Sequence, residues 1–338
     1  MGENKMYTVG IVGCGSITGT HSQVLSKMEH VVVKGLADIR PERAKALGEK
    51  VFAGEPEVFS SLEEMVEAIH PDVVHICTPH YLHVPMAVWL LEHGVNVFME
   101  KPAAINREQF AQLEAAVKAS SARLGICFQN RYNDSSREID RLLAEGELGK
   151  VVSARGLVTW CRGEKYYTES GWRGALATEG GGALINQGIH TLDLLVRWMG
   201  KPQGVEASMS NRHLKGIIEV EDTLDAYIQF PNGNALFYTT TAYGADSPVI
   251  MELVCENGSI HLEDNKVKCS YKDGRETNFE YGKNTPIGKS YWGAGHTACI
   301  NDYYHCLTEN IPFENEFESV RDTMNLMFDI YESAGQGK

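Results

Sequence analysis

The first third of the chain alternates short apolar runs with amphipathic segments, a pattern typical of parallel strands joined by helices. The apolar runs carry little charge, as expected of strands buried on both faces of a sheet, and they span residues 7–12, 31–37, 73–77, 95–99 and 124–128. The segments between them predict helices at 41–47, 62–69, 84–93 and 107–120. Ser61 and Asn106 stand at positions that favour helix N-caps. We therefore predict an α/β fold whose first domain, residues 1–128, is a Rossmann-type doubly wound parallel sheet.

The pattern changes after Gln129, where apolar and polar residues alternate and turn signals recur. A helix is expected at 134–145, a strand begins at Val151, and a second helix follows at 185–199 with Gly200 as its stop. Further strands are expected at 222–230, 235–241, 249–255 and 259–262, with later turns at 264–265 and 272–274 and two helices at 297–308 and 319–331. This pattern predicts a second, α+β domain, residues 129–338, with an open and largely antiparallel sheet. The far face of such a sheet needs a cover, so we expect a homodimer or homotetramer.

A glycine turn follows the first strand directly and opens the next helix. Gly13 permits the tight turn, and Gly15 lets a pyrophosphate approach the unpaired N–H groups of that helix. Thr18 stands where the usual dinucleotide fingerprint has its third glycine, so the motif alone is weak. The residues expected to bind a dinucleotide here are Gly13, Gly15, Ser16 and Ile17.

Asp38 ends the second strand, at the distance of ~20 residues from the glycine turn where a carboxylate meets an adenosine ribose. A carboxylate there accepts hydrogen bonds from both ribose hydroxyls and repels a 2′-phosphate, so NAD is favoured over NADP. Two alternatives stay open. Asp38 could instead cap the helix that begins near Pro41, and Arg40 leaves room for the phosphate of NADP.

Two further segments lie at the carboxyl edge of the predicted sheet, where ligands of open α/β folds bind. The first is a loop at 78–83, and the second is Glu100-Lys101-Pro102. Proline restricts the preceding lysine to extended backbone conformations, so the Lys101 side chain is held at a strand end. A lysine there can hydrogen-bond a substrate oxygen and stabilise negative charge, although the tripeptide also fits a surface lysine.

The second domain carries its candidate chemistry around a glycine run. Residues 160–182 are aromatic, basic and glycine-rich, a composition that suits either a sugar pocket or an oligomer contact. Asn186 and His190 are four residues apart on the predicted helix, so both project from one face. A lone helical histidine is usually structural, but His190 lies near the helix start after the glycines, which favours a functional role.

Composition narrows the possible functions. The 338 residues are 43% hydrophobic and 22% charged, ordinary for a globular protein, and the net charge of −14 argues against a nucleic-acid partner. No run of about 18 apolar residues exists, and residues 1–5 lack the apolar core of a signal peptide. The eight cysteines contain no C-x-x-C spacing, which argues against a disulfide framework or a zinc site. We expect a cytoplasmic protein with no membrane, nucleic-acid or metal partner.

Several motifs taken together resemble the glucose-fructose oxidoreductase, inositol dehydrogenase and rhizopine-catabolism (Gfo/Idh/MocA) family of NAD(P)-dependent oxidoreductases. Each motif is modest alone, but their order and spacing are specific, and the match covers nearly the whole chain. The matching elements are the glycine turn at 13–15, Cys77-Thr78-Pro79 with His83, Glu100-Lys101-Pro102, Trp172-Arg173, the glycine run into Asn186 and His190, and Glu221-Asp222-Thr223.

The resemblance implies hydride transfer between a nicotinamide cofactor and a secondary alcohol or ketone of a sugar, polyol or related polyhydroxy compound. Lys101 and His190 would flank the reacting carbon, with Lys101 lowering the pKa of the substrate hydroxyl and His190 taking its proton. Many family members carry aspartate one turn before the histidine, whereas this chain has Asn186. Asparagine holds no charge, so Asn186 is expected to orient a substrate hydroxyl rather than to tune the base. The implied catalytic residues are Lys101, His190 and Asn186.

The resemblance also implies which residues touch the two ligands. Besides the glycine turn and Asp38, the implied cofactor contacts are Arg40, Cys77, Thr78, Pro79, His83, Glu100 and Lys101. The implied substrate contacts are Lys101, Tyr166, Trp172, Arg173, Asn186 and His190. Glu100 would support the cofactor end of the site or pair with a nearby donor.

Other functions stay open at this point. The substrate could be a sugar nucleotide or a dihydrodiol, and relatives of the fold have become non-catalytic NAD-binding sensors or regulators. A sensor has no need of both Lys101 and His190, which argues against that alternative. The other histidines show no spacing of a closed metal site, and hydride transfer to NAD needs no metal; those considered are His80, His83, His296 and His305.

Overall fold

The chain folds into two compact units, and each is described by itself. The computed structural model describes residues 5–281 and 294–335. The first unit comprises Met1–Gln129 and His296–Ser319, and the second comprises Asn130–Gly295 and Val320–Lys338. The division into domains 1–128 and 129–338 stays a prediction, and the contacts group 296–319 with the first unit. Residues 1–4, on which the expectation about a signal peptide partly rests, lie outside the described residues.

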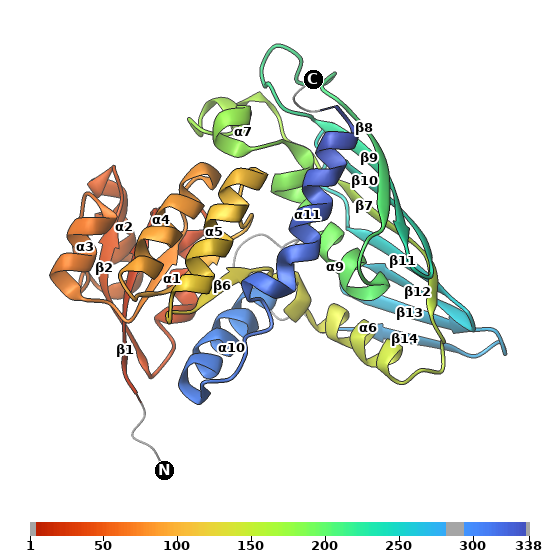
Figure 1. Ribbon diagram of the computed structural model, residues 1–338, viewed down its shortest axis with the longest axis horizontal. Helices are drawn as coiled ribbons and strands as arrows, with labels where there is room; N and C mark the ends of the chain where they lie inside the picture. The colour runs from red at the N-terminus through yellow and green to blue at the C-terminus, as the bar shows by residue number, and fades with distance from the viewer. Residues whose placement is uncertain (1–4, 282–293, 336–338) are drawn as a thin grey trace. The chain divides into compact units, whose positions relative to one another are not determined.

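The first unit is built on a six-stranded sheet whose strands are all parallel (Figure 1). The strand order is β3-β2-β1-β4-β5-β6. The strands are β1 (Tyr7–Val12), β2 (Val31–Ala37), β3 (Glu57–Phe59), β4 (Val73–Ile76), β5 (Asn96–Glu100) and β6 (Leu124–Cys127). The strand order reverses between β1 and β4, and doubly wound sheets bind ligands at such a reversal. The predicted doubly wound parallel sheet is confirmed.

Helices connect these parallel strands: α1 (Thr18–Leu25), α2 (Pro41–Phe52), α3 (Leu62–Ile69), α4 (His80–Glu92) and α5 (Arg107–Ala119). Both predicted caps are confirmed, because Ser61 Oγ accepts the N–H of Glu64 (3.1 Å) and Asn106 Oδ1 accepts the N–H of Gln109 (2.8 Å). Helix α10 (Gly295–Glu309) and the predicted helix at 297–308 coincide closely. The prediction for α2 was too short, because this helix continues past residue 47 to Phe52.

Helix α4 begins earlier than the sequence suggests. We expected a loop at 78–83, but the helix starts at His80. Pro85 lies inside the helix and cannot donate the N–H that would bond to the carbonyl of Tyr81. The side-chain amide of Gln109, on α5, donates to that carbonyl instead (3.3 Å). This contact between helices compensates for the proline, which is why the prediction of a loop was wrong.

The second unit is built on an eight-stranded sheet that is antiparallel except where β7 pairs with β10. Its order is β14-β13-β12-β11-β7-β10-β9-β8. The strands are β7 (Val151–Thr159), β8 (Gly204–Ser210), β9 (Thr223–Phe230), β10 (Gly233–Thr240), β11 (Ile250–Cys255), β12 (Gly258–Glu263), β13 (Lys266–Tyr271) and β14 (Glu276–Glu280). The predicted open, largely antiparallel sheet is confirmed, although β8, β13 and β14 have no counterpart among the predicted strands.

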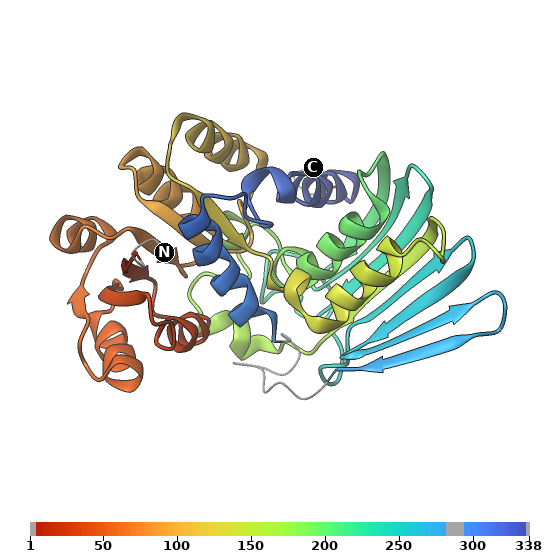
Figure 2. The same ribbon diagram turned by 90° about the horizontal axis from the view of Figure 1, so that it is seen from below.

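Helices α6 (Asp134–Ala144) and α9 (Ile189–Met199) lie on one face of this sheet (Figure 2). Helix α11 (Phe317–Ser333) is hydrogen-bonded to β8 at its C-terminal end, where the Ala207 N–H donates to Ser333 Oγ (3.0 Å). Within the described part of the second unit, no helix covers the opposite face of the sheet. Across residues 5–281 and 294–335, no helix has both the length and the apolar character needed to cross a membrane.

A buried ion pair joins α9 to the segment that precedes α6. Arg131 donates from Nε and Nη2 to the two carboxylate oxygens of Asp193 (2.8 and 2.6 Å), and Thr323 Oγ donates to Asp193 as well (2.8 Å). The two charged side chains are only 5% and 1% exposed. Burying two charges is unfavourable, so the paired hydrogen bonds and the third donor are needed to offset the lost solvation.

Replacing Asp193 with alanine should lower the free energy of unfolding by about 3 to 5 kcal/mol, because Arg131 would keep an uncompensated buried charge. The matched control is Glu145→Ala, which breaks the exposed ion pair with Arg141 and should leave the free energy of unfolding nearly unchanged. Urea denaturation of both variants measures the difference. Equal losses of stability in the two variants would contradict the assigned importance of the buried pair.

Candidate active site

The glycine turn after β1 lies against the segment that follows β4. Gly13 has a φ of 85°, and a Cβ atom added there would lie 2.8 Å from the backbone of Cys77 and Thr78. Only glycine fits this close approach. A Cβ atom added at Gly15 would meet no described atom within 4 Å, so packing does not require glycine there. The open space beside the start of α1 fits the pyrophosphate of a dinucleotide.

Asp38 is bound to the glycine turn itself. Its Oδ2 accepts the N–H of Cys14 (2.7 Å), and its Oδ1 accepts the N–H of Arg40 (2.8 Å). Neither N–H belongs to α2, which starts at Pro41, so these bonds do not cap that helix. Each carboxylate oxygen has a second lone pair, which can accept a hydrogen bond from a hydroxyl group. The position fits the recognition of a ribose by Asp38.

His83 ties together two loops at the carboxyl edge of the parallel sheet. Its Nδ1 lies 2.9 Å from the carbonyl oxygen of Pro102, and its Nε2 lies 3.0 Å from that of Thr78. Burial lowers the pKa of His83, although both carbonyl groups oppose this shift. The side chain thus holds the segment after β4 against the segment after β5. A direct contact of His83 with the cofactor stays a prediction.

Glu100 is the last residue of β5, and its partner is His21 on α1. His21 Nε2 lies 2.9 Å from Glu100 Oε1, and both side chains are buried. Burial alone would raise the pKa of Glu100, but the hydrogen bond and charge of His21 hold it below the ordinary value. Burial alone would lower the pKa of His21, but Cys77, Cys127 and Glu100 raise it well above 6.5. The two residues form a buried ion pair directly before Lys101.

A chain of hydrogen bonds extends this pair to α10. His21 Nδ1 lies 2.9 Å from His75 Nδ1, and His75 Nε2 lies 3.0 Å from the hydroxyl of Tyr304. Burial and the charge of His21 lower the pKa of His75, so His75 is the neutral member. Its Nδ1 then accepts a hydrogen bond from the Nδ1–H of His21, and its Nε2–H donates to the hydroxyl oxygen of Tyr304. The chain fixes the end of β5 and with it the start of the Lys101–Pro102 segment, whose peptide bond is cis.

The same cluster contains three side chains of metal-binding type. One ligand atom each of His21, Glu100 and Cys127 lie within 4.8 Å of one another. These distances could hold a metal ion, but His21 and Glu100 are already hydrogen-bonded to each other. Burial raises the pKa of Cys127, which keeps it a thiol rather than the thiolate a metal prefers. We interpret the cluster as a hydrogen-bonded pair with a neighbouring thiol, and the expected lack of a metal site stays a prediction.

In the second unit, a buried carboxylate holds the glycine run that leads into α9. Glu221 Oε2 accepts the N–H of Gly182 (2.8 Å), and Oε1 accepts the N–H of Leu184 and the hydroxyl of Tyr331 (both 2.9 Å). A Cβ atom added at Gly182 would lie 1.9 Å from the Glu221 carbonyl oxygen. Glycine is therefore required where this backbone approaches. Glu221 caps the segment that carries Asn186 and His190, a role that its motif did not reveal.

The helix predicted at 185–199 is not one uniform α-helix. Residues Leu184–Gly188 form a π-helical turn, and α9 follows from Ile189 to its stop at Gly200. Asn186 lies in the π turn, and His190 is the second residue of α9. Single π turns inside helices are frequent at functional sites. Apolar spacing alone cannot distinguish such a turn from an α-helix.

Glu179 was not singled out in the sequence, although it stands directly before three glycines. Its side chain is fully buried, with Oε2 accepting the N–H of Gly174 (2.5 Å) and Oε1 accepting Nδ2 of Asn186. Burial raises the pKa of Glu179 to about 7, and the charge of Glu221 adds to this. Hydrogen bonds from Gly174 and Asn186 and the charge of Arg173 oppose the shift. The predicted residue Asn186 is thus bound to a titrating carboxyl group.

The three predicted substrate residues of the aromatic loop cluster within the second unit. The guanidinium of Arg173 lies 4.4 Å from the ring centre of Tyr166 and 4.7 Å from that of Trp172. Gln187, in the π turn, donates from Nε2 to the Tyr166 hydroxyl (3.3 Å). Ser170 Oγ accepts the N–H groups of Trp172 and Arg173 (3.3 and 2.9 Å), which fixes the loop. Gln187 is therefore a further candidate for binding substrate, which the sequence did not indicate.

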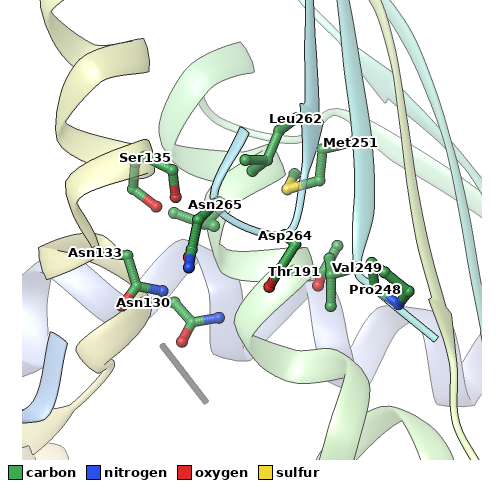
Figure 3. A pocket seen from close by; sticks show the side chains of 12 residues that line it. Asn130, Asn133, Ser135, Thr191, Pro248, Val249, Met251, Leu262, Asp264 and Asn265 are labelled. Atoms are coloured by element: carbon green, nitrogen blue, oxygen red, sulfur yellow. The ribbon is translucent and has the colours of Figure 1, made fainter. Parts of the chain in front are cut away.

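A hollow lies elsewhere in the second unit, between α6, α9, β11 and the turn after β12 (Figure 3). It is lined by polar side chains including Asn130, Asn133 and Asn265. Thr191 also lines it, although none of the predicted site residues does. Figure 3 places these side chains around the start of α6.

Two family models match this chain. Residues 7–128 match an oxidoreductase family with an NAD-binding Rossmann fold. Residues 136–261 match the GFO/IDH/MocA C-terminal domain. The first match contains all six strands of the parallel sheet, and the second contains strands β7 to β11 of the other sheet and most of β12.

Similar proteins carry the names of sugar dehydrogenases. D-glucoside 3-dehydrogenase of Escherichia coli is 27% identical over 251 residues, which is 69% of each chain. Levoglucosan dehydrogenase of Pseudarthrobacter phenanthrenivorans is 25% identical over 285 residues, 75% of this chain and 72% of its own. The solved structure of the WlbA dehydrogenase from Bordetella pertussis, in complex with NADH and UDP-GlcNAcA, has a TM-score of 0.84 at 25% identity. That match covers 99% of this chain and 98% of the other.

Replacing His21 with glutamine should destabilise the protein most at or below pH 6.5. Above 6.5 the unfolded histidine loses its proton, whereas folded His21 keeps it because its pKa is raised. The folded wild type then holds one more proton than the unfolded chain and loses up to about 1.4 kcal/mol of stability per pH unit. The His21→Gln variant lacks the stability that the protonated His21 contributes, and so it lacks this loss on raising the pH. The stability difference between the two proteins, from urea denaturation between about pH 6 and 9, should therefore shrink as the pH rises.

The control is His93→Gln, at an exposed histidine after α4, which should keep the pH dependence of the wild type. A difference between wild type and His21→Gln that stays constant across this pH range would contradict the assigned charge of His21.

Proposed function

Because the chain belongs to the GFO/IDH/MocA family of oxidoreductases with an NAD-binding Rossmann fold, we propose that it is a dehydrogenase acting on CH–OH groups. It transfers a hydride between NAD and a secondary alcohol or ketone of a sugar, polyol or related polyhydroxy compound. The observation that carries the proposal is the position of Lys101. It follows β5 directly, at the edge of the sheet where β1 and β4 deliver the glycine turn and Thr78.

NAD, when bound, supplies the acceptor for the hydride. Gly13 and Gly15 would hold its pyrophosphate at the start of α1, and the Asp38 carboxylate would accept hydrogen bonds from the ribose hydroxyls. The buried position of the Asp38 carboxylate beside the turn supports NAD over NADP, since a 2′-phosphate would meet this charge.

Lys101 and His190 act on the substrate hydroxyl. The Lys101 ammonium donates a hydrogen bond to the hydroxyl oxygen and stabilises its negative charge as the proton leaves. His190 takes that proton, a step that contributes about a hundredfold or more. In the reverse direction His190 returns the proton to the carbonyl oxygen. Asn186 orients a second hydroxyl, and the rings of Tyr166 and Trp172 with Arg173 contact the sugar.

The substrate class is supported by the relatives, which bear the names of glucoside and levoglucosan dehydrogenases. A sugar nucleotide is the second candidate, because the similar WlbA structure contains UDP-GlcNAcA. Competitive inhibition by UDP would favour this second candidate, whereas inhibition by the free sugar alone would favour the first.

We further propose that the protein works in the cytoplasm as a homodimer or homotetramer. All eight cysteines are free thiols, which suits a reducing compartment. On the face of the eight-stranded sheet that lacks a helix, Tyr227 and Leu236 pair across β9 and β10 and are 45% and 48% exposed. Val254, on β11, is 46% exposed. A second copy of the chain seated on this face would bury these side chains.

The proposed activity predicts reduction of NAD by one structural class within a panel of sugars, polyols and sugar acids. Lys101→Ala should lower kcat by about a hundredfold or more, because charge on the substrate oxygen would lose its donor. NADH binding, measured by its fluorescence, should survive in this variant. The same panel with NADP should give weaker turnover, since Asp38 opposes the 2′-phosphate.

The control is Lys118→Ala, at an exposed lysine on α5, which should keep full turnover. Turnover retained by Lys101→Ala would contradict its role. Silence of the wild type across the panel, with NADH still bound, would point to a conjugated substrate or to a sensor.

Light scattering at micromolar concentration should give the mass of at least two chains. Leu236→Arg should shift this mass toward the monomer, because it places a charge in the proposed contact. Ile311→Arg, at an exposed apolar residue of the first unit, serves as the control and should leave the mass unchanged. A monomeric wild type would contradict the proposed assembly.

A further inference from the structure

Arg173 is a half-buried arginine without a carboxylate partner among the described residues. Its Nε–H is buried and has no hydrogen-bond partner, and no described carboxylate forms an ion pair with its guanidinium group. Four other arginines that are buried or half-buried do form such pairs, and these are Arg123 with Glu316, Arg131 with Asp193, Arg162 with Asp246 and Arg197 with Asp140. A charge taken out of water is unfavourable unless an opposite charge or hydrogen bonds replace its hydration. The Arg173 guanidinium therefore lacks acceptors within the described chain.

Aromatic rings occupy part of the space around this guanidinium. The Cζ atom of Arg173 lies 4.4 Å from the ring centre of Tyr166 and 4.7 Å from that of Trp172. Aromatic rings attract a cation, but they do not replace the oxygen atoms that its N–H groups require. The backbone at Arg173 is fixed as well, because its N–H donates to Ser170 Oγ (2.9 Å). The side chain is thus held in place with donors to spare.

Glu179 compensates the charge of Arg173 only in part. The two oxygens of Glu179 accept the N–H of Gly174 and Nδ2 of Asn186. Burial raises the pKa of Glu179 to about 7, although the charge of Arg173 opposes this shift, so the carboxyl group is only partly ionised at neutral pH. Part of the charge of Arg173 is left for a ligand to balance.

Two contacts hold Arg173 beside the segment that carries His190. Its neighbour Tyr166 accepts a hydrogen bond from Nε2 of Gln187 (3.3 Å), which lies in the π turn three residues before His190. Its charge also acts on Glu179, which is hydrogen-bonded to the same turn. Both contacts lie within the second unit. A polyhydroxy compound held at His190 therefore extends toward Arg173.

We propose that Arg173 binds an oxyanion of the substrate, so that the preferred substrate is a polyhydroxy compound with a carboxylate or phosphate group. The inference rests on the proposed function and names the substrate class for that site. A guanidinium presents its donors in a planar fork, which matches two oxygens of a carboxylate or a phosphate. The oxyanion supplies the acceptors and the opposite charge that Arg173 lacks. Because hydrogen bonds between charged groups are strong, the anion should raise kcat/KM about 30-fold over a neutral group.

Substrates that differ in one group test the proposal on the wild type. The sugar that the panel identifies is compared in forms whose terminal group, at either end, is a hydroxymethyl, a carboxylate, a carboxamide or a phosphate ester. The carboxylate or the phosphate form should exceed both neutral forms about 30-fold in kcat/KM. The better of the two anionic forms identifies the group as a carboxylate or a phosphate. Assays in about 0.15 M salt screen the exposed charges of the protein.

Arg173→Gln tests whether Arg173 is the residue that reads the anion. This variant keeps a hydrogen-bond donor but removes the charge, so kcat/KM should fall about 30-fold for the anionic form and less than about threefold for the carboxamide. Arg173→Lys keeps the charge but loses the planar fork, and it should retain only about a fivefold preference for the anion. This second variant keeps the test decisive if Arg173→Gln does not fold, which thermal melting and NADH fluorescence would reveal.

The control is Lys165→Gln, at an exposed lysine of α7 (Glu164–Thr168), which changes the net charge equally and should keep the preference of the wild type. Equal kcat/KM of the wild type for the anionic and neutral forms would overturn this inference alone, because the turnover itself would uphold the proposed function. A preference for the anion that both Arg173 variants retain in full would overturn it as well. A wild type without turnover on any substrate would overturn the proposed function, and this inference with it.

Discussion

A carboxylate taken out of water costs several kcal/mol unless other groups replace the lost hydration, and this constraint shapes both units of the protein. In the first unit, Glu100 is hydrogen-bonded to the charged ring of His21, which lowers the pKa of Glu100. In the second unit, Glu179 accepts hydrogen bonds from the Gly174 N–H and from the amide of Asn186, but burial raises its pKa to about 7. One carboxyl group therefore stays ionised, while the other can take up a proton near neutral pH.

Each of these carboxyl groups adjoins a residue with a proposed chemical role. Glu100 directly precedes Lys101, so the buried pair with His21 fixes the strand end from which the lysine extends. A third carboxylate, Glu221, accepts backbone N–H groups at the start of the segment that carries His190. The glycine at 182 is needed for that contact, because any side chain would collide with the Glu221 backbone. Packing and the compensation of buried charge thus restrict the same few positions.

The sequence revealed the scaffold better than the polar contacts within it. Uncharged apolar runs predicted the parallel sheet, and Gly200 marked the end of α9, because both signals are local. The start of α4 was missed, because Gln109 of another helix satisfies the carbonyl that Pro85 leaves unpaired. The π turn was missed because its apolar spacing resembles that of an α-helix. Glu179 escaped notice because its burial and its bond to Asn186 arise only in the folded chain.

Infrared difference spectra of the carboxyl C=O stretch test the central claim, that the two buried carboxyl groups hold protons differently, most directly. Spectra of the wild type recorded between about pH 5 and 9 should contain a protonated-carboxyl band with a midpoint near 7. Subtracting spectra of Glu179→Gln should isolate this band as that of Glu179, and no buried band of Glu100 should appear within the range. A wild type without a band near 7, or a band that survives Glu179→Gln, would contradict the account.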